Sequence, residues 1–166
     1  MPSPLTTIDV DVSFNYGTQS ALVERRSGSH IRYNVVVGFI GDHRFELLRP
    51  QAQQLRERLQ KNGATRILAY LDENSMGDSR WHTGHEFMRH NYEFLLTKVL
   101  ENPWLGVVVK PKAPSTLRSR LGPVAEILER AEATRRCQVY DLGTDTGIYP
   151  PAAAALCGDV VVHGHL

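Results

Sequence analysis

The amino-acid sequence predicts an α/β fold: a doubly wound, mostly parallel sheet of about five strands with helices on both faces, plus an N-terminal edge strand. From Ile31 onwards, apolar strand-like segments alternate with segments of helical periodicity, as in parallel sheets built from right-handed βαβ units. The segment from Trp104 to Val109 is a continuous apolar run, which indicates a strand covered by helices on both faces.

The N-terminal segment has a different pattern. Apolar and polar residues alternate strictly from Ile8 to Tyr16, which is typical of a half-buried strand, and Gly17 ends the run. We expect this strand at a sheet edge or in an antiparallel pair. Residues 18–30 are polar and weakly patterned and are interpreted as a loop or as the return of a hairpin. Residues 1–30 are therefore predicted to form an extension that precedes an α/β domain over residues 31–166.

The elements of that domain follow in order. A strand over 33–40 ends at Gly41-Asp42, and a helix over 45–59 ends at Asn62-Gly63. After them come a strand over 66–71, an amphipathic helix over 87–100 stopped by Asn102-Pro103, and the apolar strand over 104–109. The last elements are a helix over 117–131, a strand over 138–142, an alanine-rich helix over 150–156 and a strand over 159–162. This succession is Rossmann-like. Because such a fold would send another helix back over the sheet, we expect the domain to be incomplete at its C-terminal end.

Composition excludes several classes of function. The formal net charge of +1, with no basic face evident in the sequence, argues against a protein that binds nucleic acid through bulk electrostatics. The pairs Arg25-Arg26 and Arg135-Arg136 are interpreted as surface residues instead of phosphate clamps. No apolar run is long enough for a membrane span, and no signal peptide is recognisable. The two cysteines, Cys137 and Cys157, lack the spacing of a metal site or a disulfide framework. We expect a cytoplasmic protein without a metal or a resident cofactor.

Polar residues gather where the predicted parallel strands end. Pro111 cannot continue a sheet ladder, so Lys110 and Lys112 should flank the end of a central strand. Open α/β sheets bind ligands at this edge, and two ammonium groups there favour an anionic small molecule. The candidate ligand-binding residues are Asp72, Glu73, Asn74, Lys110, Lys112, His163 and His165. A P-loop, a GxGxxG turn and a GxSxG elbow are all missing from the sequence, and spacing alone identifies no catalytic base.

Three segments, over 67–74, 105–112 and 153–162, occur in an order that resembles the C-terminal, donor-binding half of GT-B-type glycosyltransferases of bacterial surface-polysaccharide biosynthesis. The resemblance implies a nucleotide-sugar donor as substrate, contacted by Lys110, Lys112 and His165, with residues 72–74 lining the cleft. The sequence departs from the family in two respects. It lacks the Gly/Ser-rich turn and helix expected after the last strand, and the acceptor-binding domain expected before residue 66.

Two other readings stay open. A flavodoxin-like regulatory or protein-interaction module without catalysis could use Asp42, Asp72 and Lys110 in the manner of a receiver domain, although Lys110 comes early for that order. A small enzyme acting on a phosphorylated metabolite could use the same sheet edge. The donor sugar, the nucleotide and the acceptor are not specified by the sequence, and a homo-oligomer is compatible with it.

Overall fold

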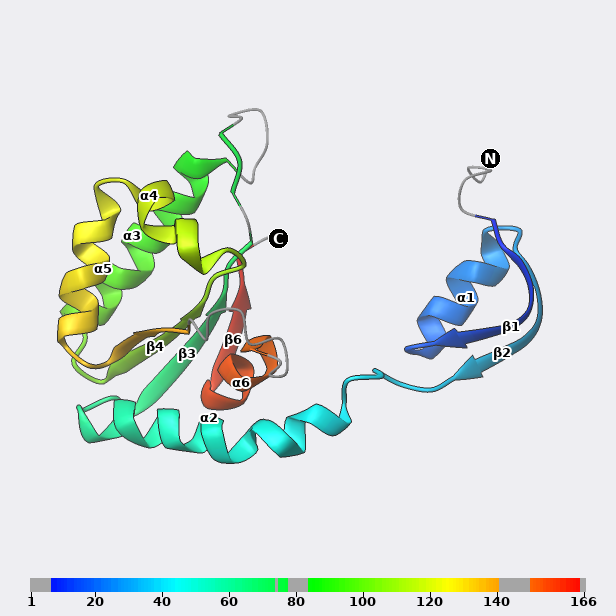
Figure 1. Cartoon of the computed structure of the whole chain (residues 1–166), viewed down its shortest axis with the longest axis horizontal. Helices are drawn as coiled ribbons and strands as arrows, with labels where there is room; N and C mark the ends of the chain where they lie inside the picture. The colour runs from blue at the N-terminus through cyan, green and yellow to red at the C-terminus, as the bar shows by residue number, and fades with distance from the viewer. Residues whose placement is uncertain (1–6, 74, 78–83, 141–149, 165–166) are drawn as a thin grey trace. The chain divides into compact units, whose positions relative to one another are not determined.

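The computed structural model describes residues 7–73, 75–77, 84–140 and 150–164. The chain divides into two compact units, Met1–Glu46 and Leu47–Leu166 (Figure 1). Each unit combines helices with a parallel sheet, which confirms the predicted α/β class. Within the described residues, no helix is both long enough and apolar enough to cross a membrane.

The larger unit contains a four-stranded sheet in the order β5–β4–β3–β6, with every neighbouring pair parallel. Its strands are β3 (Arg66–Leu71), β4 (Leu105–Lys110), β5 (Cys137–Val139) and β6 (Val160–His163). As the apolar run predicts, β4 lies inside the sheet and Val107, Val108 and Val109 are fully buried. In β6, at one edge of the sheet, Val160 and Val161 are exposed.

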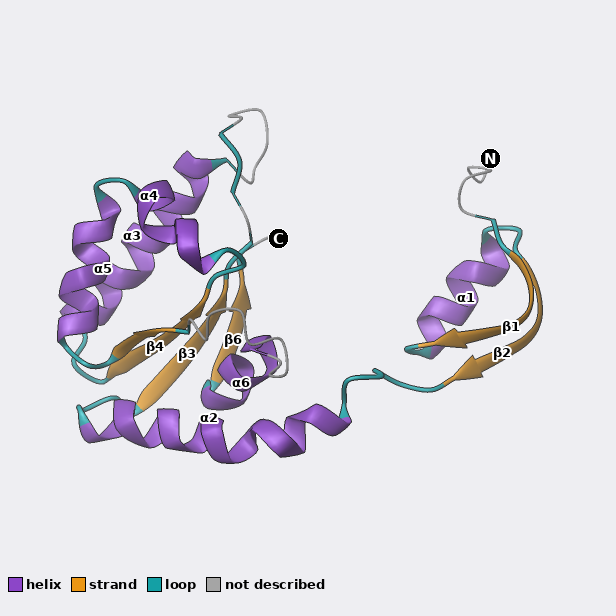
Figure 2. Cartoon of the chain, in the orientation of Figure 1, coloured by secondary structure: helices purple, strands orange, loops and turns teal. Residues whose placement is uncertain are grey.

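Helices cover both faces of this sheet (Figure 2). One face carries α3 (His85–Glu101), a short 3-10 turn η2 (Pro114–Thr116), α4 (Leu117–Leu121) and α5 (Val124–Ala133), and the other carries α2 (His43–Lys61) and α6 (Pro150–Cys157). The core on the α3 side joins helix residues Tyr92, Leu96 and Leu128 to Val107 and Val109. Alternation along β4 turns Val108 to the opposite face.

The smaller unit corrects the predicted position of the N-terminal strand. β1 (Asp9–Asn15) and β2 (His30–Val36) form a separate two-stranded parallel sheet instead of joining the main one. The connection between them, expected to be a loop, contains α1 (Thr18–Arg26). A parallel pair of strands requires such a crossover. The helix has no apolar periodicity that could predict it, because Ala21 is its only buried residue. The main sheet therefore has four strands, because the segment expected to begin it pairs with β1.

A second correction concerns Arg136, interpreted from sequence as a surface residue. Arg136 is buried, and its Nη1 donates to the carbonyl oxygens of Val99, Asn102 and Leu105 at 2.9, 2.8 and 2.7 Å. The guanidinium thus satisfies carbonyl groups where α3 ends and β4 begins. Gly106 lies beside it in tight packing: a Cβ added there would lie 2.8 Å from a neighbouring side-chain carbon.

Candidate functional site

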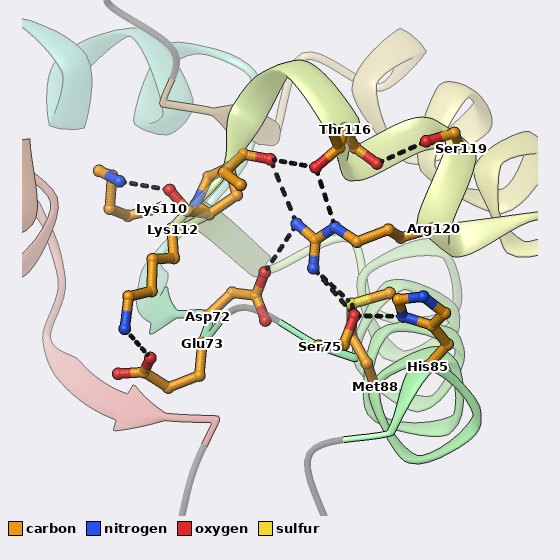
Figure 3. Close-up of polar contacts among 12 residues, drawn as sticks. Asp72, Glu73, Ser75, His85, Met88, Lys110, Lys112, Thr116, Ser119 and Arg120 are labelled. Carbon is orange, nitrogen blue, oxygen red and sulfur yellow. Dashed lines mark hydrogen bonds and ion pairs between the residues drawn. The ribbon is translucent and has the colours of Figure 1, made fainter. Parts of the chain in front are cut away.

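The carboxyl ends of β3, β4 and β6 lie at one edge of the main sheet, because the three strands are adjacent and parallel. Glu73 follows β3, Lys110 ends β4, Lys112 follows it, and His163 ends β6. The structure therefore brings these residues, together with Asp72, which directly follows β3, to one edge, as the sequence analysis predicts. Figure 3 labels Asp72, Glu73, Lys110 and Lys112.

Glu73, which follows β3, links the ends of β4 and β6, the strands on either side of β3. Lys112 Nζ donates to Glu73 Oε2 at 2.7 Å, and Glu73 Oε1 lies 3.0 Å from His163 Nε2. The hydrogen bond from Lys112 is the main cause that lowers the pKa of Glu73, and His163 contributes in the same direction. The Lys112 and His163 side chains are 61% and 44% exposed, so both are within reach of a ligand from solvent.

The turn after β4 takes its geometry from Pro111. Pro111 is fully buried and has no N–H to continue the ladder, so the strand ends there. The Lys110 ammonium, half-buried, donates to the Pro111 carbonyl oxygen, and the Lys110 carbonyl accepts the Asp72 N–H at 3.0 Å. Lys110 and Lys112 consequently leave a fixed backbone at the end of the central strand.

Asp72 lies beneath the surface of this edge. Its side chain is 3% exposed, and its Oδ2 has no hydrogen-bond partner among the described residues. The nearby Arg120 Nη2 is 3.8 Å from that oxygen, too long for a hydrogen bond. Burial raises the pKa of Asp72 from 3.8 to about 6, against the opposing effects of the Arg120 charge and the Tyr92 hydroxyl. The Tyr92 hydroxyl lowers the pKa without reaching hydrogen-bond geometry, since it too lacks a partner in the described part of the chain.

Arg120 connects the loops around Asp72, and sequence reasoning missed it. Although it is charged, Arg120 is 8% exposed. It donates to Ser75 Oγ at 3.0 Å, to the Ala113 carbonyl oxygen at 3.2 Å and to Thr116 Oγ1 at 3.2 Å. Ser75 Oγ in turn lies 2.7 Å from His85 Nδ1 (Figure 3). An arginine in a five-residue helix carries no sequence signal that distinguishes it from exposed Arg118 on the same helix.

Two predicted site residues, Asn74 and His165, lie outside the described residues. A groove of about 440 Å³ opens at the start of α3, where Gly84, His85 and Arg89 line it. Another, of about 460 Å³, runs along α2 and β5. Within the described part of the chain, no three His, Cys, Asp or Glu side chains are placed to hold a metal ion.

Fold and site together define an α/β protein with a charged cluster at the carboxyl edge of a parallel sheet. Comparison of the chain with protein-family models, with curated proteins and with solved structures found no match. The chemistry available at this edge is the binding of an anionic group by ammonium and imidazole donors.

Proposed function

We propose that the carboxyl edge of the main sheet binds the phosphate groups of a nucleotide-sugar donor, in a glycosyltransferase-like domain of surface-polysaccharide biosynthesis. The observation that carries the proposal is the convergence of Lys112 and His163, from two different strand ends, on the single carboxylate of Glu73. Parallel α/β sheets bind ligands at this edge, and a fixed pair of donors suits an anion.

Glu73 occupies the position that a phosphate would take. A diphosphate carries more negative charge than a carboxylate and has more acceptor oxygens, so it competes for both donors. The Glu73 side chain is 31% exposed and can turn away from them when the anion enters. In the free protein this carboxylate keeps the two donors together.

The buried residues below the edge serve as its framework. Arg120 ties the loop after β3 to the turn after β4 through Ser75 and Ala113. Asp72 is too buried to contact the donor directly. Its burial also weighs against the receiver-like alternative, which requires an accessible acceptor carboxylate.

The sequence resemblance supports the same location. The three segments that resemble GT-B-type glycosyltransferases correspond to β3 with its exit, β4 with its exit, and α6 with β6. These are the elements that border the charged cluster. Substrate class therefore rests on the resemblance, and the position of the site rests on the converging side chains.

Titration calorimetry with UDP-, GDP- and CMP-linked sugars tests the proposal. Lys112→Ala and Lys110→Ala should each weaken binding by about 1.5–3 kcal/mol, the scale of a hydrogen bond to a charged group. Lys98→Ala is the matched control, because Lys98 also pairs with a glutamate, Glu101, at 2.7 Å, and lies on α3. It should bind as the wild type does. Undetectable binding by the wild-type chain, or equal binding by all variants, would contradict the proposal.

A Glu73→Gln variant tests the competition directly. The amide no longer holds Lys112 and His163 by charge, so both become available to the ligand and the nucleotide sugar should bind several-fold more tightly. Unchanged affinity in this variant, with binding lost in Lys112→Ala, would mean that Glu73 does not compete with the anion.

A further inference from the structure

The sheet of the smaller unit has an exposed apolar face. Eight side chains along β1, β2 and their flanking positions are 39% to 68% exposed: Ile8, Val10, Val12, Phe14, Tyr16, Tyr33, Val35 and Val37. We call this set the β1–β2 apolar face. The face belongs to the unit Met1–Glu46.

These side chains share one side of the sheet. Alternate residues of a strand point the same way, and the parallel register places Val12 beside Tyr33 and Phe14 beside Val35. Helix α1 covers the opposite side, where Glu24 accepts hydrogen bonds from Ser13 and Asn15, each at 3.1 Å. The crossover helix therefore covers the polar side of the sheet and leaves the apolar side open.

Such a face requires a cover. Parallel sheets are almost always buried on both sides, and two strands alone are not independently stable in water. The exposed fractions leave roughly 800 Å² of the face accessible, which is the area that each partner contributes to a standard interface. Phe14, Tyr16 and Tyr33 add the aromatic side chains that interface centres favour.

We propose that this face binds the same face of a second copy of the chain, in a two-fold symmetric dimer that packs sheet on sheet. A two-fold interface brings a patch against an identical patch, so a net charge on the face would meet the same net charge, and its eight side chains are uncharged. The Arg32 guanidinium carbon lies 5.2 Å from the centre of the Tyr33 ring, but Arg32 Nη1 is 4.0 Å from Asp11 Oδ1, so this charge is paired. Neutrality, area and aromatic content together favour a second copy over a charged partner.

Analytical ultracentrifugation of the full chain over a wide concentration range tests the dimer. The wild-type chain should be dimeric, and Phe14→Arg should be monomeric because the dimer would bury two added charges in an apolar interface. Phe94→Arg is the control: Phe94 is 66% exposed, against 68% for Phe14, and lies on α3 of the larger unit. The control should remain dimeric. A wild-type chain that stays monomeric at every concentration overturns the proposal.

A second variant removes the objection that an arginine unfolds the small unit. Val12→Thr combined with Val35→Thr keeps shape and β-propensity but adds a hydroxyl at each position. The dissociation constant of the dimer should rise at least about tenfold, since four hydroxyls would be desolvated. Far-UV circular dichroism should match the wild type. An unchanged dissociation constant in this folded variant would show that the β1–β2 apolar face is not the dimer interface.

Discussion

Replacing Asp72 by asparagine should remove the part of the pH dependence of stability that Asp72 causes. The carboxyl group has a pKa of about 6 in the folded chain and 3.8 as the ordinary value, so the folded state binds the proton more tightly. A raised pKa contributes stability that is complete below the ordinary value and is lost as pH rises through the folded value. The difference of about two units, at 1.36 kcal/mol each, amounts to about 3 kcal/mol. The side chain is 3% exposed, so solvent screening removes little of it.

Urea denaturation of wild type and Asp72→Asn across this pH range measures the effect. Other groups titrate equally in both chains, so the difference between the two free energies of unfolding isolates Asp72. Wild type should lose about 3 kcal/mol relative to the variant between about pH 4 and about pH 7. A flat difference, or one in which wild type gains stability as pH rises, would mean that the Arg120 charge outweighs burial and that the reasoning is wrong.

Other consequences of the packing are measurable by the same means. Arg120→Ala should lower the free energy of unfolding by about 3–5 kcal/mol because it strands a buried carboxylate, whereas exposed Arg118→Ala should cost about 0–1 kcal/mol; equal losses in urea would refute the structural role of Arg120. Gly106→Ala should lower the free energy of unfolding by about 1–3 kcal/mol, since its Cβ would lie 2.8 Å from a neighbouring carbon. Gly17→Ala is the control, because a Cβ at that position has open space around it. A Gly106→Ala variant as stable as the wild type would contradict the packing. The Cys137 thiol is buried and burial raises its pKa to about 12, so thiol reagents should modify it only as the chain unfolds; rapid labelling of the native protein would oppose this.

The elements with strong periodicity were the ones that the sequence could locate. The continuous apolar run at Val107–Val109 predicts a central buried strand, and β4 is that strand. β3 covers the predicted residues 66–71. The sheet to which a strand belongs is a different question, because pairing partners leave no local pattern. The alternation over Ile8–Tyr16 therefore predicts a strand at a sheet edge or in an antiparallel pair, but does not reveal that its partner is β2 or that the pair is parallel.

The candidate site likewise contains residues that a local sequence pattern predicts and residues that only the tertiary structure reveals. Residues directly after a buried strand can be found from the strand itself, and Glu73, Lys112 and His163 do meet at one edge. The buried groups below them could not be found, because an arginine gives the same sequence signal whether it is exposed or buried. Arg120 becomes recognisable only when tertiary structure places Ser75 and Ala113 around its guanidinium.

The most direct test of the proposed site is a two-dimensional ¹H–¹⁵N NMR titration of the wild-type chain with UDP and, separately, with inorganic pyrophosphate. Amide signals of residues 72, 73, 110, 112, 163 and 164 should shift with both ligands, because the phosphates are expected to meet Lys112 and His163 at the ends of β4 and β6. Shifts confined to the groove along α2 and β5, or no shifts with either ligand, would contradict a phosphate site at the carboxyl edge of the sheet.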